Sequence, residues 1–262
     1  MMRNHLTKLG FYSALVLTTL FVGCCVNLGG SFRAKAERTE ELTASAADVI
    51  TLDVSTNVGT IDIEPGQTDE VRIEAEITVK AKTEEEAEML VQEVRIVAEK
   101  SGQKLVVKAV KPSGFGRNQL AVDFTITAPP RLALACVTNV GDIRLTGFTD
   151  RVTAKTDVGT IRCRDLHGET DLHTNVGDIT LEYAAAAPAA LRASATTNVG
   201  NVEFTGPETI SAQLEARVNV GSIDTDRPLT ITGKIEKSVR ATLGDAEGRI
   251  SLRTNVGSVK IR

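Results

Sequence analysis

Two histidines and three carboxylates lie close together in the segment RDLHGETDLH. His167 and His173 stand among Asp165, Glu169 and Asp171, and imidazole and carboxylate groups are the ligands that divalent metals such as Zn²⁺ take in proteins. The alternation of the surrounding sequence, however, places His173 on the outer face of a strand and His167 in a turn. We therefore interpret the segment as solvated surface and predict no metal site.

Aspartates that follow a recurring glycine indicate a second kind of metal chemistry. Asp142 and Asp178 occupy this position, as aspartates do in calcium-binding nonapeptide repeats. Those repeats need a denser pattern of glycine and aspartate, and other copies here carry Thr160, Asn201 or Ser222 instead. No serine or cysteine is paired with a histidine in a nucleophile motif. The sequence predicts no catalytic residue and no cofactor, so we expect a protein that is not an enzyme.

A carbohydrate-active enzyme is the less favoured alternative that the sequence leaves open. Parallel β-helices include polysaccharide-cleaving enzymes, and a pair of carboxylates on one face could hydrolyse a glycosidic bond. Sugar sites usually present aromatic faces, yet the chain has no tryptophan, seven phenylalanines and two tyrosines. No pair of carboxylates stands out from the rest.

The elements that must position any such residues follow from a phrase that recurs along the chain. It reads TNVGDIRL from Thr138, TDVGTIRC from Thr156 and TNVGDITL from Thr174. The glycines of its copies are Gly59, Gly141, Gly159, Gly177, Gly200, Gly221 and Gly257, with Gly244 in a degenerate copy. A period near 20 residues is typical of a solenoid, in which no repeat buries its apolar face alone.

Alternation around each glycine predicts which side chains face inward. Aliphatic residues occupy the position before the glycine and the second and fourth positions after it, as in Val176, Ile179 and Leu181. Period-2 alternation indicates strands with one buried face, and threonine three residues before the glycine shares that face. The inward positions that flank the glycine are three residues apart, so a bulge or corner must absorb one residue there, which glycine does at low cost.

The regular repeats follow a longer N-terminal section. Residues 71–82 alternate and predict a strand, and Thr83 followed by three glutamates predicts a helix over about 84–93. Further strands are expected near 94–99, 104–110 and 120–128. The predicted fold class is therefore all-β: a β-solenoid (β-helix-like) of about 20-residue coils with a strand-helix-strand lead-in. We divide the chain into a signal peptide (1–23), a flexible tether (24–47), an N-terminal β-rich section with one short helix (48–130) and regular β-solenoid repeats (131–262).

In every copy except the degenerate one at Gly244, the residue two before the glycine is asparagine or aspartate. Coils stacked about 4.8 Å apart would align these residues in a column along one edge. The favoured interpretation is a ladder that satisfies the corners, because such side chains hydrogen-bond nearby backbone. The other interpretation is a polar stripe that recognises a repetitive ligand. The column comprises Asn57 and the possible surface recognition residues Asn139, Asp157, Asn175, Asn198, Asn219 and Asn255.

The N-terminus carries the pattern of an export signal. Arg3 and Lys8 precede an apolar run over residues 11–23, which is too short for a comfortable membrane-spanning helix. The segment FVGC, which ends at Cys24, is similar to a bacterial lipobox, in which the cysteine becomes the lipidated first residue. Cys24 is therefore the predicted lipidation site and would tether the protein to a membrane. Plain secretion and an uncleaved anchor stay open as alternatives.

Charge argues against a nucleic-acid partner. The chain has 30 lysines and arginines against 34 aspartates and glutamates, and loss of residues 1–23 would remove two of the basic residues and no acid. Binding of nucleic acid needs a basic patch. The expected partners are a membrane, through the lipid anchor, and an unidentified envelope protein or glycan.

Four cysteines in an exported protein could form a disulfide framework. Cys24 and Cys25, however, belong to the lipobox region, and Cys136 and Cys163 both have inward parity. A disulfide between the latter two would need Cα atoms closer than about 7 Å, which sequence spacing does not establish. We favour two buried free thiols.

The whole pattern resembles the bacterial putative-adhesin family of β-strand repeat domains. The resemblance covers about residues 48–262 and depends on the repeated VGxI and VGxV phrases, the strand-helix-strand lead-in and the segment VDFTITAPPRLAL from Val122. It implies a β-repeat fold and an adhesin-like role, and it brings no catalytic motif to this chain.

These observations together favour an exported, non-enzymatic lipoprotein of the cell envelope that binds or scaffolds, lipid-anchored to a membrane. An envelope-stress or signalling component that meets a membrane partner is the alternative.

The last copy of the phrase runs to Arg262 with no separate capping element. We therefore expect the last coil to expose a strand edge. Lys260 and Arg262 would blunt that edge against pairing, which we favour, or a partner would cover it.

Overall fold

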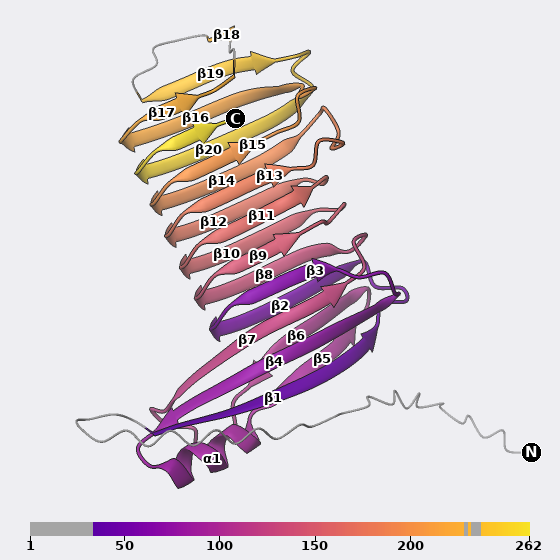
Figure 1. The fold of residues 1–262 in the computed structure, drawn as a ribbon, viewed down its shortest axis with the longest axis vertical. Coiled ribbons are helices and arrows are strands. Elements are labelled where there is room, and N and C mark those ends of the chain that lie inside the picture. Colours follow the sequence, from indigo (N-terminus) through magenta and orange to yellow (C-terminus); the bar gives the residue numbers. More distant parts are fainter. Residues whose placement is uncertain (1–33, 228–229, 232–236) are drawn as a thin grey trace, which may run out of the picture.

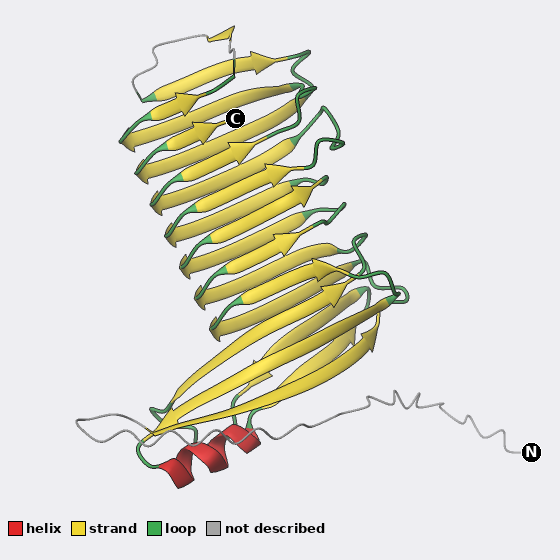
Figure 2. Ribbon diagram, in the orientation of Figure 1, coloured by secondary structure: helices red, strands yellow, loops and turns green. Residues whose placement is uncertain are grey.

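The computed structural model describes residues 34–227, 230–231 and 237–262 as two long facing β-sheets with one short helix at the N-terminal end (Figures 1 and 2). The predicted signal peptide and the lipidation site Cys24 lie outside the described residues. Within the described ranges, no helix has the length and apolar character needed to cross a membrane. The predicted all-β solenoid is confirmed.

Each sheet runs the length of the stack. Sheet A contains, in spatial order, β1 (Ala34–Ser45), β4 (Glu70–Ala81), β7 (Gln119–Ala128), β3 (Ile61–Pro65), β9 (Ile143–Thr146), β11 (Ile161–Leu166), β13 (Ile179–Tyr183), β15 (Val202–Thr205), β21 (Val259–Ile261) and β17 (Ile223–Thr225). Sheet B contains β18 (Thr230–Ile231), β19 (Ser238–Leu243), β16 (Ala212–Val220), β20 (Gly248–Val256), β14 (Arg192–Val199), β12 (Thr170–Val176), β10 (Val152–Val158), β8 (Ala133–Val140), β2 (Thr51–Val58), β6 (Lys104–Val110) and β5 (Arg95–Ser101).

One strand from each sheet makes a coil. In a typical coil, β10 crosses sheet B, the chain turns sharply at Gly159, and β11 returns in sheet A. Neighbouring coils are parallel and in register, so that Thr156 lies opposite both Thr138 and Thr174. Each position of the repeated phrase therefore forms a straight row along the stack.

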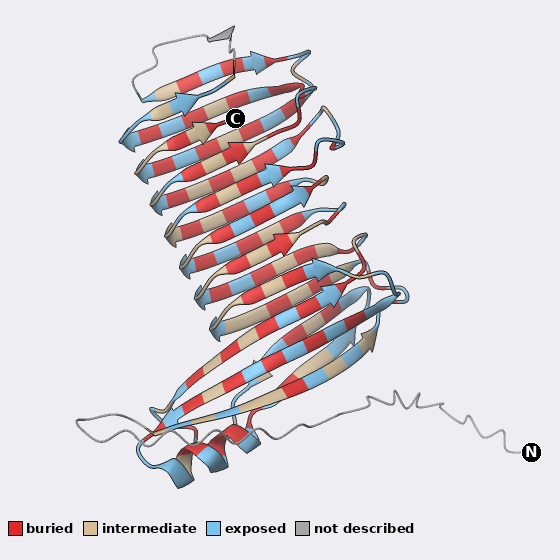
Figure 3. Cartoon of the chain, viewed as in Figure 1, coloured by how far each residue is buried: buried red, intermediate tan, exposed pale blue. Residues whose placement is uncertain are grey.

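The inward positions after the glycine agree with the sequence prediction. Ile143, Ile161 and Ile179 are fully buried, and so are Leu145 and Leu181 two residues further on in their strands. Figure 3 shows buried and exposed residues alternating along the strands of both sheets. One continuous apolar core fills the space between the sheets.

The valine before each glycine does not face inward, and the sequence prediction was wrong there. Val176 is 48% exposed and Val220 is 62% exposed. The last inward residue before the corner is the buried threonine, for example Thr174, and the next inward residue is Ile179. Four residues, 175–178, therefore lie between successive inward positions, and the valine at the end of the strand belongs to the corner.

The corner glycines stack so closely that a side chain has no room. A Cβ atom at Gly159 would lie 2.0 Å from the carbonyl oxygen of Gly141, and one at Gly177 would lie 2.0 Å from that of Gly159. These glycines also have φ near +150°, a region that L-residues rarely adopt. Gly244 of the degenerate copy differs, with φ +53°, and it follows β19, which runs antiparallel to β16 and makes no coil.

The C-terminal coil does not expose a strand edge, contrary to the sequence expectation. β20 pairs with β14 on one side and with β16 on the other, and β21 lies between β15 and β17. The side chain of Arg262 pairs with Glu203 at 2.7 Å and with Asp226 at 3.6 Å. Arg262 therefore forms ion pairs with residues of the coils on both sides. The last coil in sequence is inserted between two earlier coils.

The N-terminal section contributes coils to the same stack. β2 and β3 form one coil, and β6 and β7 form another that lies outside it. Both sheets continue across the boundary near residue 130, since β8 pairs with β2 and β9 pairs with β3. The predicted helix is confirmed as α1 (Glu84–Glu93), and Oγ1 of its N-cap Thr83 accepts a hydrogen bond from the backbone N–H of Glu86 at 3.2 Å.

The prediction of a flexible tether was wrong for residues 34–45. They form β1, which pairs antiparallel with β4 along its whole length. Ala36 and Leu42 pack against the core, and Arg38 and Glu40 form a largely buried ion pair at 2.9 Å. Apart from Leu42, the inward face of this strand is made of alanines and the charged pair Arg38 and Glu40, so the strand lacks a clear alternation of apolar and polar residues.

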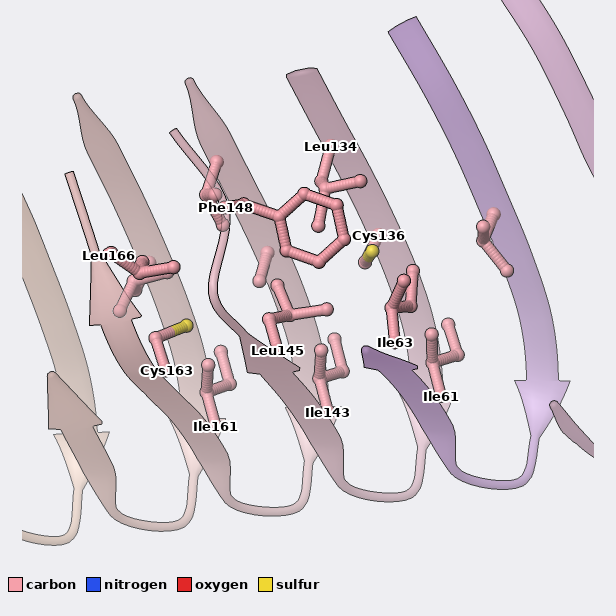
Figure 4. Close-up of a cluster of buried hydrophobic side chains, with 14 of the residues drawn as sticks. Ile61, Ile63, Leu134, Cys136, Ile143, Leu145, Phe148, Ile161, Cys163 and Leu166 are labelled. Atoms are coloured by element: carbon pink, nitrogen blue, oxygen red, sulfur yellow. The ribbon is translucent and has the colours of Figure 1, made fainter. Parts of the chain in front are cut away.

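Cys136 and Cys163 are buried free thiols, as the sequence analysis favoured. They project into the core from β8 and β11 among isoleucine and leucine side chains (Figure 4). Burial raises the pKa of Cys163 to about 12, and burial also raises the pKa of Cys136. Both side chains therefore stay protonated at neutral pH and act as small apolar groups.

Aspartate substitutions at Ile179 and Val176 should separate inner from outer positions. Ile179→Asp places an unpaired carboxylate in the core and should lower the free energy of unfolding by at least about 3 kcal/mol. Val176→Asp leaves the new charge in water and should cost less than about 1 kcal/mol. Urea denaturation of the two variants measures the difference, and equal destabilisation would contradict the observed faces.

Candidate ligand-binding edge

The stacked corners form one continuous edge where sheet B passes into sheet A (Figure 1). Each corner exposes an asparagine or aspartate and then a valine. We call this surface the corner edge and divide it into two rows. The amide row is, in spatial order, Asn57, Asn139, Asp157, Asn175, Asn198, Asn255 and Asn219; the valine row is Val58, Val140, Val158, Val176, Val199, Val256 and Val220.

The amide row is a hydrogen-bonded ladder, as the favoured interpretation predicted in part. Nδ2 of Asn198 donates to Oδ1 of Asn175 at 3.0 Å, and Nδ2 of Asn255 donates to Oδ1 of Asn198 at 2.9 Å. Asn175 donates in the same way to Asp157 at 2.9 Å. The carboxylate of Asp157 has no proton to donate onward to Asn139, so the ladder is interrupted there. The side chains satisfy one another, whereas we had expected them to satisfy corner backbone.

The valine row is the main exposed apolar feature of the described residues. Its members are 42–62% exposed, and each repeats the same side chain at the spacing of the strands, about 4.8 Å. The row follows the amide row along the whole stack. Together they give the corner edge a polar strip and an apolar strip side by side.

Buried threonines hold the corners in place. The hydroxyl of Thr174 donates to the carbonyl oxygen of Gly159 at 3.1 Å, and that of Thr197 donates to Gly177 at 2.9 Å. The same contact recurs at Thr138, Thr156 and Thr254. Each threonine thereby satisfies a glycine carbonyl of the neighbouring coil, and its predicted place on the inner face is confirmed.

Carboxylates after the glycine also support the corners. Oδ1 of Asp142 accepts from the backbone N–H of Thr160 at 2.9 Å, and Oδ1 of Asp178 accepts from that of Asn201 at 2.7 Å. Asn201 repeats the contact with Ser258 at 2.9 Å. Each of these side-chain oxygens therefore satisfies a backbone N–H group at the corner of the next coil.

A groove of about 340 Å³ opens at the N-terminal end of the corner edge. Asn57 and Asn139 of the amide row line it together with Lys108 and Lys111. The rows end here because the loop over residues 111–118 replaces the Asn-Val-Gly corner between β6 and β7. Sequence reasoning missed both lysines, since they lie outside the repeated phrase; strand register would have found Lys108, which pairs with Ser55.

The two histidines of the first candidate metal site do not converge. His173 lies on the outer face of β12 in register with Lys155 and Thr196. His167 lies after β11, and its backbone N–H donates to Phe148 at 3.1 Å. The part of the chain that the structure describes contains no group of three or more His, Cys, Asp or Glu side chains that could hold a metal ion.

Comparison with known proteins gives a family and a general resemblance. The Toastrack DUF4097 family matches residues 132–262, in agreement with the β-strand repeat family that the sequence resembles. Comparison with curated proteins gives no match. The fold is similar to a putative cell adhesion protein from Clostridium sporogenes ATCC 15579 (12% identity, 86% of this chain and 99% of that chain covered, TM-score 0.49). It is also similar to a putative adhesin from Bacteroides fragilis NCTC 9343 (16% identity, 89% and 100% covered, TM-score 0.44).

Replacing Asp157 by asparagine should stabilise the protein slightly. The new amide can donate to Asn139 and join the two segments of the ladder, which should add about 0.5 kcal/mol to the free energy of unfolding. Thermal unfolding measures the change. Asp171→Asn is the matched control, because it removes an exposed carboxylate from β12 outside the amide row. A melting temperature that falls, or that rises equally in the control, would show that closing the gap in the ladder does not stabilise the protein.

Proposed function

The chain belongs to the Toastrack DUF4097 family, and from this premise we propose that it is a non-enzymatic, adhesin-like binding module of the cell envelope. The observation that supports this function is the corner edge, which presents the same amide and valine on coil after coil. An extended ligand with a regular repeat would meet the same contacts at each step of about 4.8 Å. Such a ligand would bind with its repeating units in register with the coils.

The chemistry of the corner edge suits binding. Each asparagine amide has two donors and an acceptor with two lone pairs, and the ladder uses one donor and one lone pair. The remaining groups are available to a ligand, for example to the hydroxyls of a glycan or the backbone of an extended peptide. Burial of the exposed valines would add an apolar contribution of about 25 cal/mol per Å². Amides and valines supply no general acid, general base or nucleophile.

The proposal places the module at a membrane surface through a lipid on Cys24. The nine residues between Cys24 and β1 can span at most about 35 Å. Such a tether would hold the end of the stack that carries α1 near the membrane and let the corner edge extend away from it. This geometry suits a scaffold that reaches a ligand in the envelope.

Site-specific photo-crosslinking in cells tests the corner edge. A benzoyl-phenylalanine placed at Val158, Val176 or Val199 should give adducts with the ligand, because these side chains are exposed along the edge. The matched control is the same residue at Glu182, which is exposed on the outer face of sheet A. Adducts at the control position and none at the edge would refute the proposed site. Mass spectrometry of the adducts would tell a glycan from a protein.

Metabolic labelling with a palmitate analogue tests the anchor. The parent should incorporate the label and accumulate as a labelled, uncleaved precursor when globomycin blocks signal-peptide cleavage, and Cys24→Ala should lose the label completely, because the thioether to the lipid forms on that sulfur. Cys25→Ala is the matched control and should label like the parent. Full labelling of Cys24→Ala would refute lipidation at this residue.

A further inference from the structure

Five arginines gather on the outer face of sheet B near the C-terminal end of the stack. Arg192 lies on β14, Arg249 and Arg253 on β20, Arg217 on β16 and Arg240 on β19, and all five are exposed. We call them the arginine patch. Arg192 is in register with Arg249, and Arg217 with Arg253, so these pairs stand on adjacent strands about 4.8 Å apart. Like charges directly opposite each other destabilise a sheet. Arg217 and Arg253 share a carboxylate partner, Glu215, but fold stability does not account for the pair Arg192 and Arg249.

Glu215 is the single acid on the outer face of these four strands within the described residues. It pairs with Arg217 at 2.5 Å, with Arg240 at 3.3 Å and with Arg253 at 3.4 Å. Partial burial raises the pKa of Glu215, but hydrogen bonds and positive charge from Arg217 and Arg240 outweigh that effect and lower it overall. An ionised Glu215 therefore orders three guanidinium groups, each of which has further N–H donors beyond its contact with the carboxylate.

The interleaved order of the strands assembles the patch. β20, the last long strand in sequence, lies between β14 and β16, and β19 lies beyond β16 (Figure 1). The same faces carry hydroxyls from Ser194, Thr196 and Ser251, and Asn198 and Asn255 of the amide row end two of the strands. The result is a flat surface of guanidinium groups, hydroxyls and amides, on a chain whose net charge is −4.

We propose that the arginine patch binds a linear anionic glycan whose repeat carries carboxylate, sulfate or phosphate groups. Guanidinium groups bind such oxyanions through paired hydrogen bonds. The excess of five arginines over one glutamate supplies the complementary charge, and the hydroxyls and amides between them match the hydroxyls of sugar units. The proposal does not depend on ligand binding at the corner edge, because its charged residues lie outside that edge and only Asn198 and Asn255 belong to both surfaces.

Two other polyanions fit the patch less well. Single-stranded nucleic acid is held by aromatic side chains on which bases stack, and the described outer faces of these four strands carry no aromatic residue. Anionic membranes are bound most firmly where apolar side chains insert beside basic ones, and the patch is flat and polar. A glycan needs neither feature.

Binding of the full chain to defined polymers tests the proposal. The probes are heparin for sulfate, polygalacturonate for carboxylate and poly(glycerol phosphate) for phosphate, with neutral dextran as the negative control, measured by biolayer interferometry at low and physiological salt. The double variant Arg217→Gln/Arg253→Gln removes two charges from the patch. The control Arg162→Gln/Arg164→Gln removes two charges from exposed positions on β11 in sheet A.

At least one charged polymer should bind, and the patch variant should bind it about tenfold more weakly while the control variant stays within about twofold of the parent. Arg192→Gln/Arg249→Gln should weaken binding as well, which keeps the test valid if the first pair lowers expression. Equal losses in the patch and control variants, or equal binding of dextran, would overturn the proposal. Tighter binding of an oligonucleotide or of anionic vesicles would overturn the assignment to a glycan. Unchanged crosslinking at Val176 in the patch variant would show that the two surfaces act separately.

Discussion

The close approach of one corner glycine to the next is the constraint on which the rest of the stack depends. The carbonyl oxygen of Gly159 occupies the place where a side chain of Gly177 would be. Only at this separation can the hydroxyl of Thr174 reach that same carbonyl and can the amides of neighbouring coils meet in a ladder. The phrase Thr-Asn-Val-Gly therefore encodes a contact between coils: the glycine admits the carbonyl, the threonine satisfies it, and the asparagine links the corners on the outside.

A parallel stack leaves open strand edges that would invite pairing with another chain, and the ends of this stack cover three of the four such edges, leaving β17 as the terminal strand of sheet A among the described residues. At one end β6 and β7 lie outside β2 and β3, and at the other β16 and β17 lie outside β20 and β21. Antiparallel strands β4, β5 and β19 then pair with these outer coils. Because the inserted coil pairs with strands on both sides, each end joins segments far apart in sequence, and such non-local pairing slows folding.

Much of this fold could be predicted from the sequence, because the inward residues after the glycine and the helix N-cap at Thr83 are local signals. The outward orientation of Val176 could not be predicted. A period-2 pattern shows that the corner contains an extra residue, but it does not show whether that residue lies before or after the glycine. Neither could the position of β20, because every copy of the phrase can stack on every other copy. For the same reason the amide row was visible in the sequence while the arginine patch was not: Arg249 becomes a neighbour of Arg192, and Arg253 a neighbour of Arg217, only after the coils interleave.

The exposed valines pose a question that packing alone does not answer. A β-branched residue favours the extended backbone that each corner needs, but threonine is β-branched too and would meet water at lower cost. The chain places threonine at the buried position three residues before the glycine and valine at the exposed one beside it, as in Thr174 and Val176. The buried threonine is explained by its hydrogen bond to a glycine carbonyl. The exposed valine makes no such hydrogen bond, and its repetition along the edge is the feature that the proposed ligand contact would use.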